Sequence, residues 1–171
     1  MALSPGRSGK VLLLGIGNDI LSDDAIGIRL IEDIQQKSGF RDVVFETAMV
    51  GGLEILELIQ GYSMTIFFDA IRTTDGRPGE TYRMSLEDFN PTLHLSNLHD
   101  ISFIQAINLG KALGLELPAH IGIFAVEIVE DTLFSKEISR ELSFHYPQIL
   151  TKALDFLESM LAKYQFMPSE I

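Results

Sequence analysis

The chain has 171 residues, enough for one well-buried domain and short for two. With 13 basic and 24 acidic residues its formal net charge is -11, so its surface repels phosphate backbones and we expect no nucleic-acid partner. It has no cysteine, which excludes disulfides, thiolate metal sites and a cysteine nucleophile; any metal must be held by Asp, Glu, His or backbone oxygens. No segment reaches the roughly 18 to 20 apolar residues of a membrane span. Acidic residues stand where a signal-peptide cleavage site would follow the first apolar run, so we expect a cytoplasmic protein without membrane contact.

The pattern of apolar residues predicts a single domain over residues 1–171, of which residues 1–10, rich in Ser, Gly and Pro, form a loose N-terminal arm. Helical spacing begins at Asp24 and stops at Ser38-Gly39, and a short helix follows Gly51-Gly52. Expected strands, in chain order, are 11–14, 42–46, 64–71, the edge segment 80–86 and 119–126, and further helices are expected at 100–113 and 148–164. Strands that alternate with helices predict an α/β fold, a three-layer sandwich in which helices cover both faces of a parallel or mainly parallel sheet.

Several common nucleotide and hydrolase motifs are incomplete or missing. Gly15-Ile16-Gly17 follows a strand, but Ile20 stands where a dinucleotide-binding loop has its third glycine. Residues 6–10 resemble a phosphate loop but are too short and follow no strand. Because the Gly-x-Ser-x-Gly and His-Glu-x-x-His patterns are also absent, serine-hydrolase and zincin chemistry have no support.

Three polar residues are expected to meet at the carboxyl ends of the strands, where open α/β sheets bind their ligands. Asp24 follows the first strand at a helix start, Asp69 ends the most apolar central strand, and His99 stands at the entry to the helix at 100–113. An acid directly after a buried apolar run is costly unless a cation, a donor or water satisfies it. Two carboxylates and a neutral imidazole leave coordination positions open, which suits a divalent metal such as nickel or zinc.

Each of these residues also has a purely structural interpretation. Asp23 and Asp24 would stabilise a helix dipole by about 0.3–1 kcal/mol without any other role. Asp69 could be a turn acid at a strand end, and His99 a capping or surface histidine. Glu127 directly follows the strand at 119–126, and its position at the edge of the core is explained without any functional role.

The segment Gly15–Gly27 closely resembles the opening signature of the nickel–iron hydrogenase maturation endopeptidases, in which a strand leads into Gly-x-Gly-Asn, an apolar stretch, an acidic pair and a glycine. Phe67-Phe68-Asp69-Ala70 matches the family's apolar-apolar-Asp-Ala strand end, and Leu98-His99-Asp100 its histidine before a helix. By this resemblance Asp24, Asp69 and His99 are both the metal ligands and the catalytic residues, and Gly15, Gly17 and Asn18 shape the turn that carries Asp24.

The resemblance implies a twisted, mainly parallel sheet and a definite activity. Members of this family are endopeptidases that cut a C-terminal extension from the hydrogenase large-subunit precursor after nickel has been installed. The partner would then be that precursor, and its nickel would complete the coordination by the enzyme's own ligands; other divalent cations would also fit the site.

Two segments depart from the family pattern. Its Asp-Gly-Gly-Thr segment corresponds to Thr47–Val50, after which only Gly51-Gly52 remains, and its Ser-Pro-His has become Asn97-Leu98-His99. These changes motivate one alternative, a non-catalytic module that senses the metal-loaded precursor without cutting it. A second alternative is a different metal-dependent hydrolase on the same scaffold, acting on a small molecule.

Overall fold

The computed structural model describes residues 7–37, 39–40, 42–49, 51–85, 98–164 and 166, with the backbone alone for residues 98–102 and 104. Its elements are β1 (Val11–Ile16), the 3-10 helix η1 (Ser22–Ala25), α1 (Ile26–Lys37), β2 (Val43–Ala48), α2 (Glu54–Ile59), β3 (Met64–Ile71), β4 (Thr81–Ser85), α3 (Leu98–Ala112), β5 (His120–Glu127) and α4 (Arg140–Lys163).

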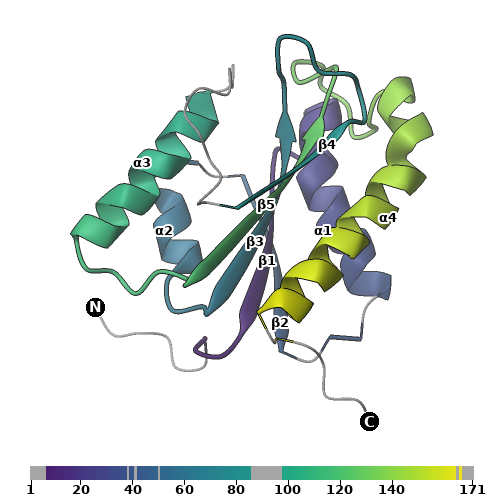
Figure 1. The fold of residues 1–171 in the computed structure, drawn as a ribbon. Helices are drawn as coiled ribbons and strands as arrows, with labels where there is room; N and C mark the ends of the chain where they lie inside the picture. The colour runs from purple at the N-terminus through teal and green to yellow at the C-terminus, as the bar shows by residue number, and fades with distance from the viewer. Residues whose placement is uncertain are drawn as a thin grey trace.

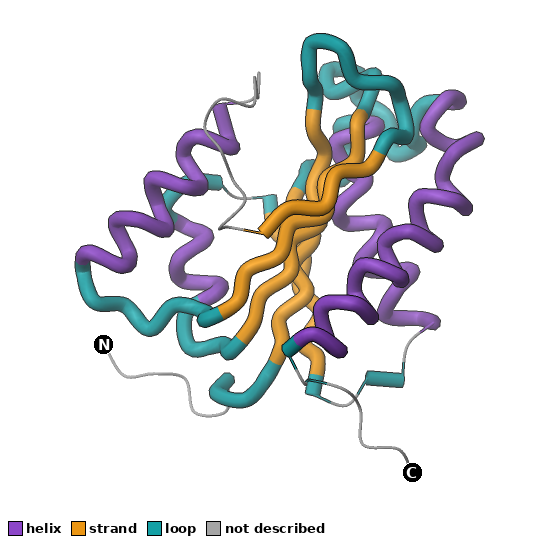
Figure 2. The backbone as a smooth tube through the Cα atoms, viewed as in Figure 1, coloured by secondary structure: helices purple, strands orange, loops and turns teal. Residues whose placement is uncertain are grey.

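A five-stranded sheet with the order β2-β1-β3-β5-β4 forms the centre of the molecule. The first four strands are parallel and β4 is antiparallel to β5. Helices α1 and α4 cover one face, and α2 and α3 cover the other (Figures 1 and 2). The predicted α/β sandwich with a mainly parallel sheet and helices on both faces is therefore confirmed.

Each face of the sheet has its own apolar core. Leu13, Ile66 and Phe68 point toward α1 and α4, whereas Leu14 and Phe67 point toward α2 and α3. Successive residues of a strand point to opposite faces, so the unbroken apolar runs seen in the sequence follow from burial on both sides. No helix within the described part of the chain is both long and apolar enough to cross a membrane.

Two sequence-based boundaries were wrong. The last helix begins at Arg140 rather than 148, with Pro147 inside it, because Ser139 caps it by accepting a hydrogen bond from the Leu142 N–H at 3.2 Å. In the expected N-terminal arm, residues 1–6 lie outside the described part, but Arg7 donates to the backbone oxygens of Glu57 and Gln60, at 3.1 and 3.0 Å, and is not loose.

The core prediction for the helix at 100–113 was only partly correct. Ile107 is fully buried, but Leu113 lies just beyond the end of α3 with 65% of its surface exposed. The side chains of Ile101 and Ile104 lie outside the described part.

Candidate functional site

The sheet has its topological switch point between β1 and β3. From β1 the chain passes through α1 to β2 on one side, and β3 pairs with the other side of β1. In open α/β sheets a crevice for ligands forms beyond the carboxyl ends of the strands at such a point. Asp24, in η1 directly after the β1 loop, and Asp69, near the end of β3, both belong to this edge of the sheet.

Glycines allow η1 and the start of α1 to approach the strand ends closely. A Cβ atom on Gly27 would lie 2.2 Å from the Phe68 carbonyl oxygen and 2.3 Å from that of Ile16, so only glycine fits between β1 and β3. Gly17 has φ +149° and would bring a Cβ within 2.0 Å of the Asp24 carbonyl oxygen. The backbone of Asp24 is therefore packed directly against the loop that leaves β1.

The Asp24 carboxylate is half-buried and oriented by that loop. Its Oδ2 accepts a hydrogen bond from the backbone N–H of Asn18 at 2.8 Å. The Asn18 side chain in turn accepts one from the N–H of Ile20 at 3.2 Å. The Gly-x-Gly-Asn segment thus fixes both the backbone and the carboxylate of Asp24.

The side chain of Asp69 points to the face of the sheet that α2 and α3 cover. It stands two residues after Phe67, whose side chain packs in the core on that face. The carboxylate is half-buried, and its Oδ1 accepts from the N–H of Ala70 at 2.8 Å. Since α3 runs into the amino end of β5, its first turn lies at the carboxyl edge of the sheet, on the face to which Asp69 points (Figure 1).

The third predicted ligand is not fully described. The backbone of His99 lies in the first turn of α3, but its side chain lies outside the described part. Among the side chains that are described, no three His, Asp, Glu or Cys residues are grouped so as to hold a metal ion. The set of Asp24, Asp69 and His99 therefore stays a prediction.

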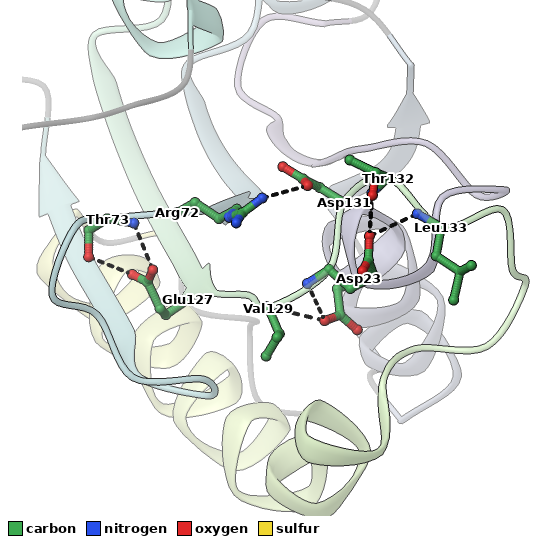
Figure 3. A network of polar contacts seen from close by, with 9 residues as sticks. Asp23, Arg72, Thr73, Glu127, Val129, Asp131, Thr132 and Leu133 are labelled. Atoms are coloured by element: carbon green, nitrogen blue, oxygen red, sulfur yellow. Dashed lines mark hydrogen bonds and ion pairs between the residues drawn. The ribbon is translucent and has the colours of Figure 1, made fainter.

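The two acids of the Asp23-Asp24 pair have different environments. Asp23 is fully buried, and its carboxylate accepts hydrogen bonds from the backbone N–H groups of Ser139 at 2.6 Å, Glu130 at 3.1 Å and Val129 at 3.3 Å. Figure 3 shows the contact with Val129. These donors belong to the loop between β5 and α4. Sequence reasoning treated Asp23 only as a helix-start acid, because nothing local indicates partners more than 100 residues away.

A second buried acid, Glu127, fixes the loop on the other side of β5. It is 2% exposed and accepts from the N–H of Thr73 at 2.7 Å and the Thr73 hydroxyl at 3.0 Å (Figure 3), and also from the Tyr82 hydroxyl at 3.0 Å. Burial raises the pKa of Tyr82, the Thr73 hydroxyl lowers it, and the Glu127 carboxylate raises it again. Glu127 is therefore an anchor for the turn after β3.

An ion pair joins the two loops that Asp23 and Glu127 hold. Arg72 Nη1 and Asp131 Oδ1 are 2.7 Å apart, with both side chains partly exposed (Figure 3). Next to it, Glu130 accepts from the N–H groups of Thr132 and Leu133, and the contacts to Thr132 lower the pKa of its carboxyl. The loops at this edge are thus ordered by side-chain hydrogen bonds to the backbone.

Large apolar side chains are exposed around the same edge of the sheet. They follow the carboxyl ends of β1, β2 and β5, and they are Ile20, Met49, Leu53, Val129, Leu133 and Phe134. Phe134 is 79% exposed. Leu53 was expected inside the short helix, but it precedes α2 and is 58% exposed. Apolar side chains gathered on one edge are typical of a surface that binds another protein.

Comparisons with known proteins agree with this architecture. The sequence matches no family model. It is 24% identical over 152 residues to the hydrogenase expression/formation protein HupD of Thiocapsa roseopersicina, covering 86% of this chain and 67% of HupD. It is 25% identical over 151 residues to HoxM of Cupriavidus necator, covering 86% of this chain and 73% of HoxM. Over 71 residues it is 34% identical to the hydrogenase 2 maturation protease of Escherichia coli. This match covers less than half of each protein, 41% of this chain and 43% of the protease.

Solved structures with similar names have the same fold. The hydrogenase maturating endopeptidase HybD from E. coli superposes with a TM-score of 0.66 at 21% identity, covering 88% of this chain and 93% of HybD. The [NiFe] hydrogenase maturation protease HybD from Thermococcus kodakarensis has a TM-score of 0.63 at 22% identity, covering 85% and 97%. The Gly15–Gly27 signature, the glycine-shaped switch point and these sequence relatives agree, and the chain is a distant sequence relative, with the same fold, of the HybD/HycI-type [NiFe] hydrogenase maturation proteases.

Proposed function

We propose that this chain is an endopeptidase that removes a C-terminal extension from the large-subunit precursor of a nickel–iron hydrogenase, and that nickel in the precursor triggers the cleavage. The observation that carries the proposal is the close approach of the start of α1, directly after η1, to the ends of β1 and β3, where a Gly27 Cβ would meet the carbonyl oxygens of Ile16 and Phe68. This packing brings the segment with Asp24 to the strand end with Asp69. The names of the relatives support the assignment.

The donor set fits a divalent metal of the precursor. Asp24 and Asp69 are half-buried carboxylates, and His99 would add an imidazole from the first turn of α3. Oxygen and nitrogen donors suit nickel or zinc, and the chain has no thiolate to compete. A bound divalent ion supplies Lewis-acid polarisation of a carbonyl, or a water of lowered pKa.

The protein's own residues would prepare the site before the precursor arrives. The Asn18 N–H holds Asp24 Oδ2 at 2.8 Å, which limits the rotation of that carboxylate. Asp69 is held by the rigid end of a central strand. Ligands that are fixed in advance lose little conformational entropy when a precursor binds.

The exposed apolar side chains at the carboxyl edge favour a protein substrate over a small molecule. Ile20, Leu133 and Phe134 lie on loops that border the switch point, and a protein surface would cover them. This observation argues against the small-molecule hydrolase. Cleavage in the cytoplasm, as expected from the sequence, is part of the proposal.

The experiment is intact-mass analysis of the large-subunit precursor from the same organism, prepared with and without nickel and mixed with this protein. We expect a C-terminal peptide to be lost from the nickel-loaded precursor and no cleavage of the nickel-free one. Co-elution of an uncut, nickel-loaded precursor with the protein would instead support the sensor. If the precursor is neither bound nor cut, both the endopeptidase and the sensor hypothesis are contradicted.

A further inference from the structure

We propose that Asp23 is a positioning residue for Asp24, and that it does this by tying η1 to the loop between β5 and α4. The inference rests on the proposed function for the role of Asp24, whereas the contacts of Asp23 are independent of it. The two residues are consecutive in a 3-10 helix of four residues, so any shift of one backbone is passed to the other.

Asp23 is the centre of a set of contacts between segments that are far apart in sequence. Its Oδ2 accepts from Val129 and Glu130, and its Oδ1 accepts from Ser139 at 2.6 Å. Its own N–H donates to the Glu130 carbonyl at 3.2 Å. Asp23 is fully buried, so these backbone donors take the place of water around its carboxylate.

Neighbouring backbone contacts extend this connection. The Ser22 N–H donates to the Ser135 carbonyl at 2.8 Å, and the Ser135 N–H donates to the Ile20 carbonyl at 3.0 Å. The Ser22 hydroxyl, 2% exposed, donates to the Glu137 carbonyl at 3.1 Å. Residues 20–23 and 129–139 therefore form one joined unit, even though more than 100 residues separate them.

Asp24 is held between this unit and the β1 loop. On one side Asp23 fixes the preceding peptide; on the other, the Asp24 carbonyl packs against Gly17 and its carboxylate accepts from Asn18. Without the Asp23 anchor, the peptide before Asp24 would be held to the β5–α4 loop by the neighbouring contacts of Ile20 and Ser22 and no longer by a side chain at position 23. Residues that orient metal ligands from the next layer typically change metal affinity about 10- to 100-fold when they are mutated.

The test variant is Asp23→Asn, which has the same size but only one acceptor oxygen. An asparagine can accept from Ser139, or from Val129 and Glu130, but its NH2 group then faces the remaining N–H donors. The matched control is Tyr146→Phe, which removes the hydrogen bond from the Tyr146 hydroxyl to Asp33 at 2.7 Å. That bond also joins the α1 side to α4, but it lies away from η1.

The first measurement is the affinity of each folded variant for Ni²⁺ alone, by titration calorimetry. We expect Asp23→Asn to bind Ni²⁺ about 10- to 100-fold more weakly than the unmodified chain, and Tyr146→Phe to bind within about twofold of it. The second measurement needs no metal. The amide resonance of Asn18, which donates to Asp24, should shift and exchange faster in Asp23→Asn but stay unchanged in Tyr146→Phe.

A second pair of variants leaves Asp23 intact. Ser139 has φ -54°, within the range of proline, so Ser139→Pro removes only the N–H that Asp23 accepts and the hydroxyl cap of α4. Ser139→Gly removes the cap and keeps the N–H. We expect the Asn18 amide to move in Ser139→Pro relative to Ser139→Gly.

The outcomes separate this inference from the proposed function. An unchanged Asn18 amide in folded Asp23→Asn and in Ser139→Pro overturns the positioning role, and so does Ni²⁺ affinity equal to that of the unmodified chain. If the unmodified chain binds no Ni²⁺ and cuts no precursor, the proposed function fails, and the Asn18 amide alone decides the role of Asp23.

Discussion

Substituting alanine for Gly27 should damage both the fold and the site, because this residue lies where α1 crosses the ends of β1 and β3. The added Cβ would lie 2.2 Å from the Phe68 carbonyl oxygen and 2.3 Å from the Ile16 carbonyl oxygen. Real Cβ contacts essentially never fall below 3.0 Å, so α1 or a strand must move by about 0.8 Å, the difference between 3.0 and 2.2 Å. Both obstructing atoms are backbone atoms of central strands, which cannot swing aside as a side chain would.

The expected cost follows from this geometry. Overpacking a well-filled interior typically destabilises by about 1–3 kcal/mol, and an obstruction by two backbone carbonyls belongs in the upper part of that range. We therefore expect Gly27→Ala to lower the free energy of unfolding by about 2–3 kcal/mol. At this chain length the melting temperature should fall by about 2–4 °C for each kcal/mol.

The assay is urea unfolding followed by circular dichroism, since the chain has no tryptophan to report by fluorescence. Gly39→Ala is the control, because a Cβ there meets no atom within 4 Å. The free energy of unfolding of this control should stay the same or rise by up to about 1 kcal/mol. A loss below about 1 kcal/mol in Gly27→Ala would refute the argument that this contact sets the position of the start of α1.

Three further predictions concern other residues. Thr65→Val should raise the free energy of unfolding by about 1–3 kcal/mol in urea titrations, because the buried Thr65 hydroxyl has no hydrogen-bond partner among the described residues. A variant less stable than the unmodified chain would contradict this prediction. Glu127→Gln should lower it by a similar amount and speed hydrogen exchange of the Thr73 amide, and unchanged exchange would count against the anchor. Burial and the hydrogen bond to Asp33 raise the pKa of Tyr146 above its ordinary value of about 10, so the folded state holds this proton more tightly than the unfolded chain. The contribution of Tyr146 to stability is then fully present below pH 10 and is lost as the pH rises toward the folded pKa. Between pH 8 and pH 11 the urea midpoint should therefore fall less in Tyr146→Phe than in the unmodified chain. An equal fall in the two proteins would refute this prediction.

The sheet was predictable because burial on both faces leaves an unbroken apolar run. Met64–Ile71 was expected as a strand with the bounds that the structure gives it. The start of α4 was not predictable from apolar spacing, because Pro147 interrupts the pattern and the helix is begun eight residues earlier by the Ser139 cap. Local side-chain capping therefore decided a boundary that periodicity missed.

The candidate site shows the same limit. Asp24 and Asp69 could be selected because ligands of open α/β sheets bind beyond the carboxyl ends of the strands, and because both segments match the signature of the family that the chain resembles. Asp23 and Glu127 could not be distinguished from ordinary loop acids, because their donors, in Ser139 and Thr73, are brought to them only by the complete fold. The burial of these two acids became visible only in the structure.

The measurement that tests the central claim most directly is the rate of cleavage of a nickel-loaded large-subunit precursor, with the unmodified chain and with the Asp24→Asn and Asp69→Asn variants, each shown by circular dichroism to be folded. The account predicts that the unmodified chain releases a C-terminal peptide and that each variant is at least about 100-fold slower, as expected when a group that holds a catalytic metal is lost. Cleavage by Asp69→Asn at the rate of the unmodified chain, or an intact precursor in every mixture, would contradict it.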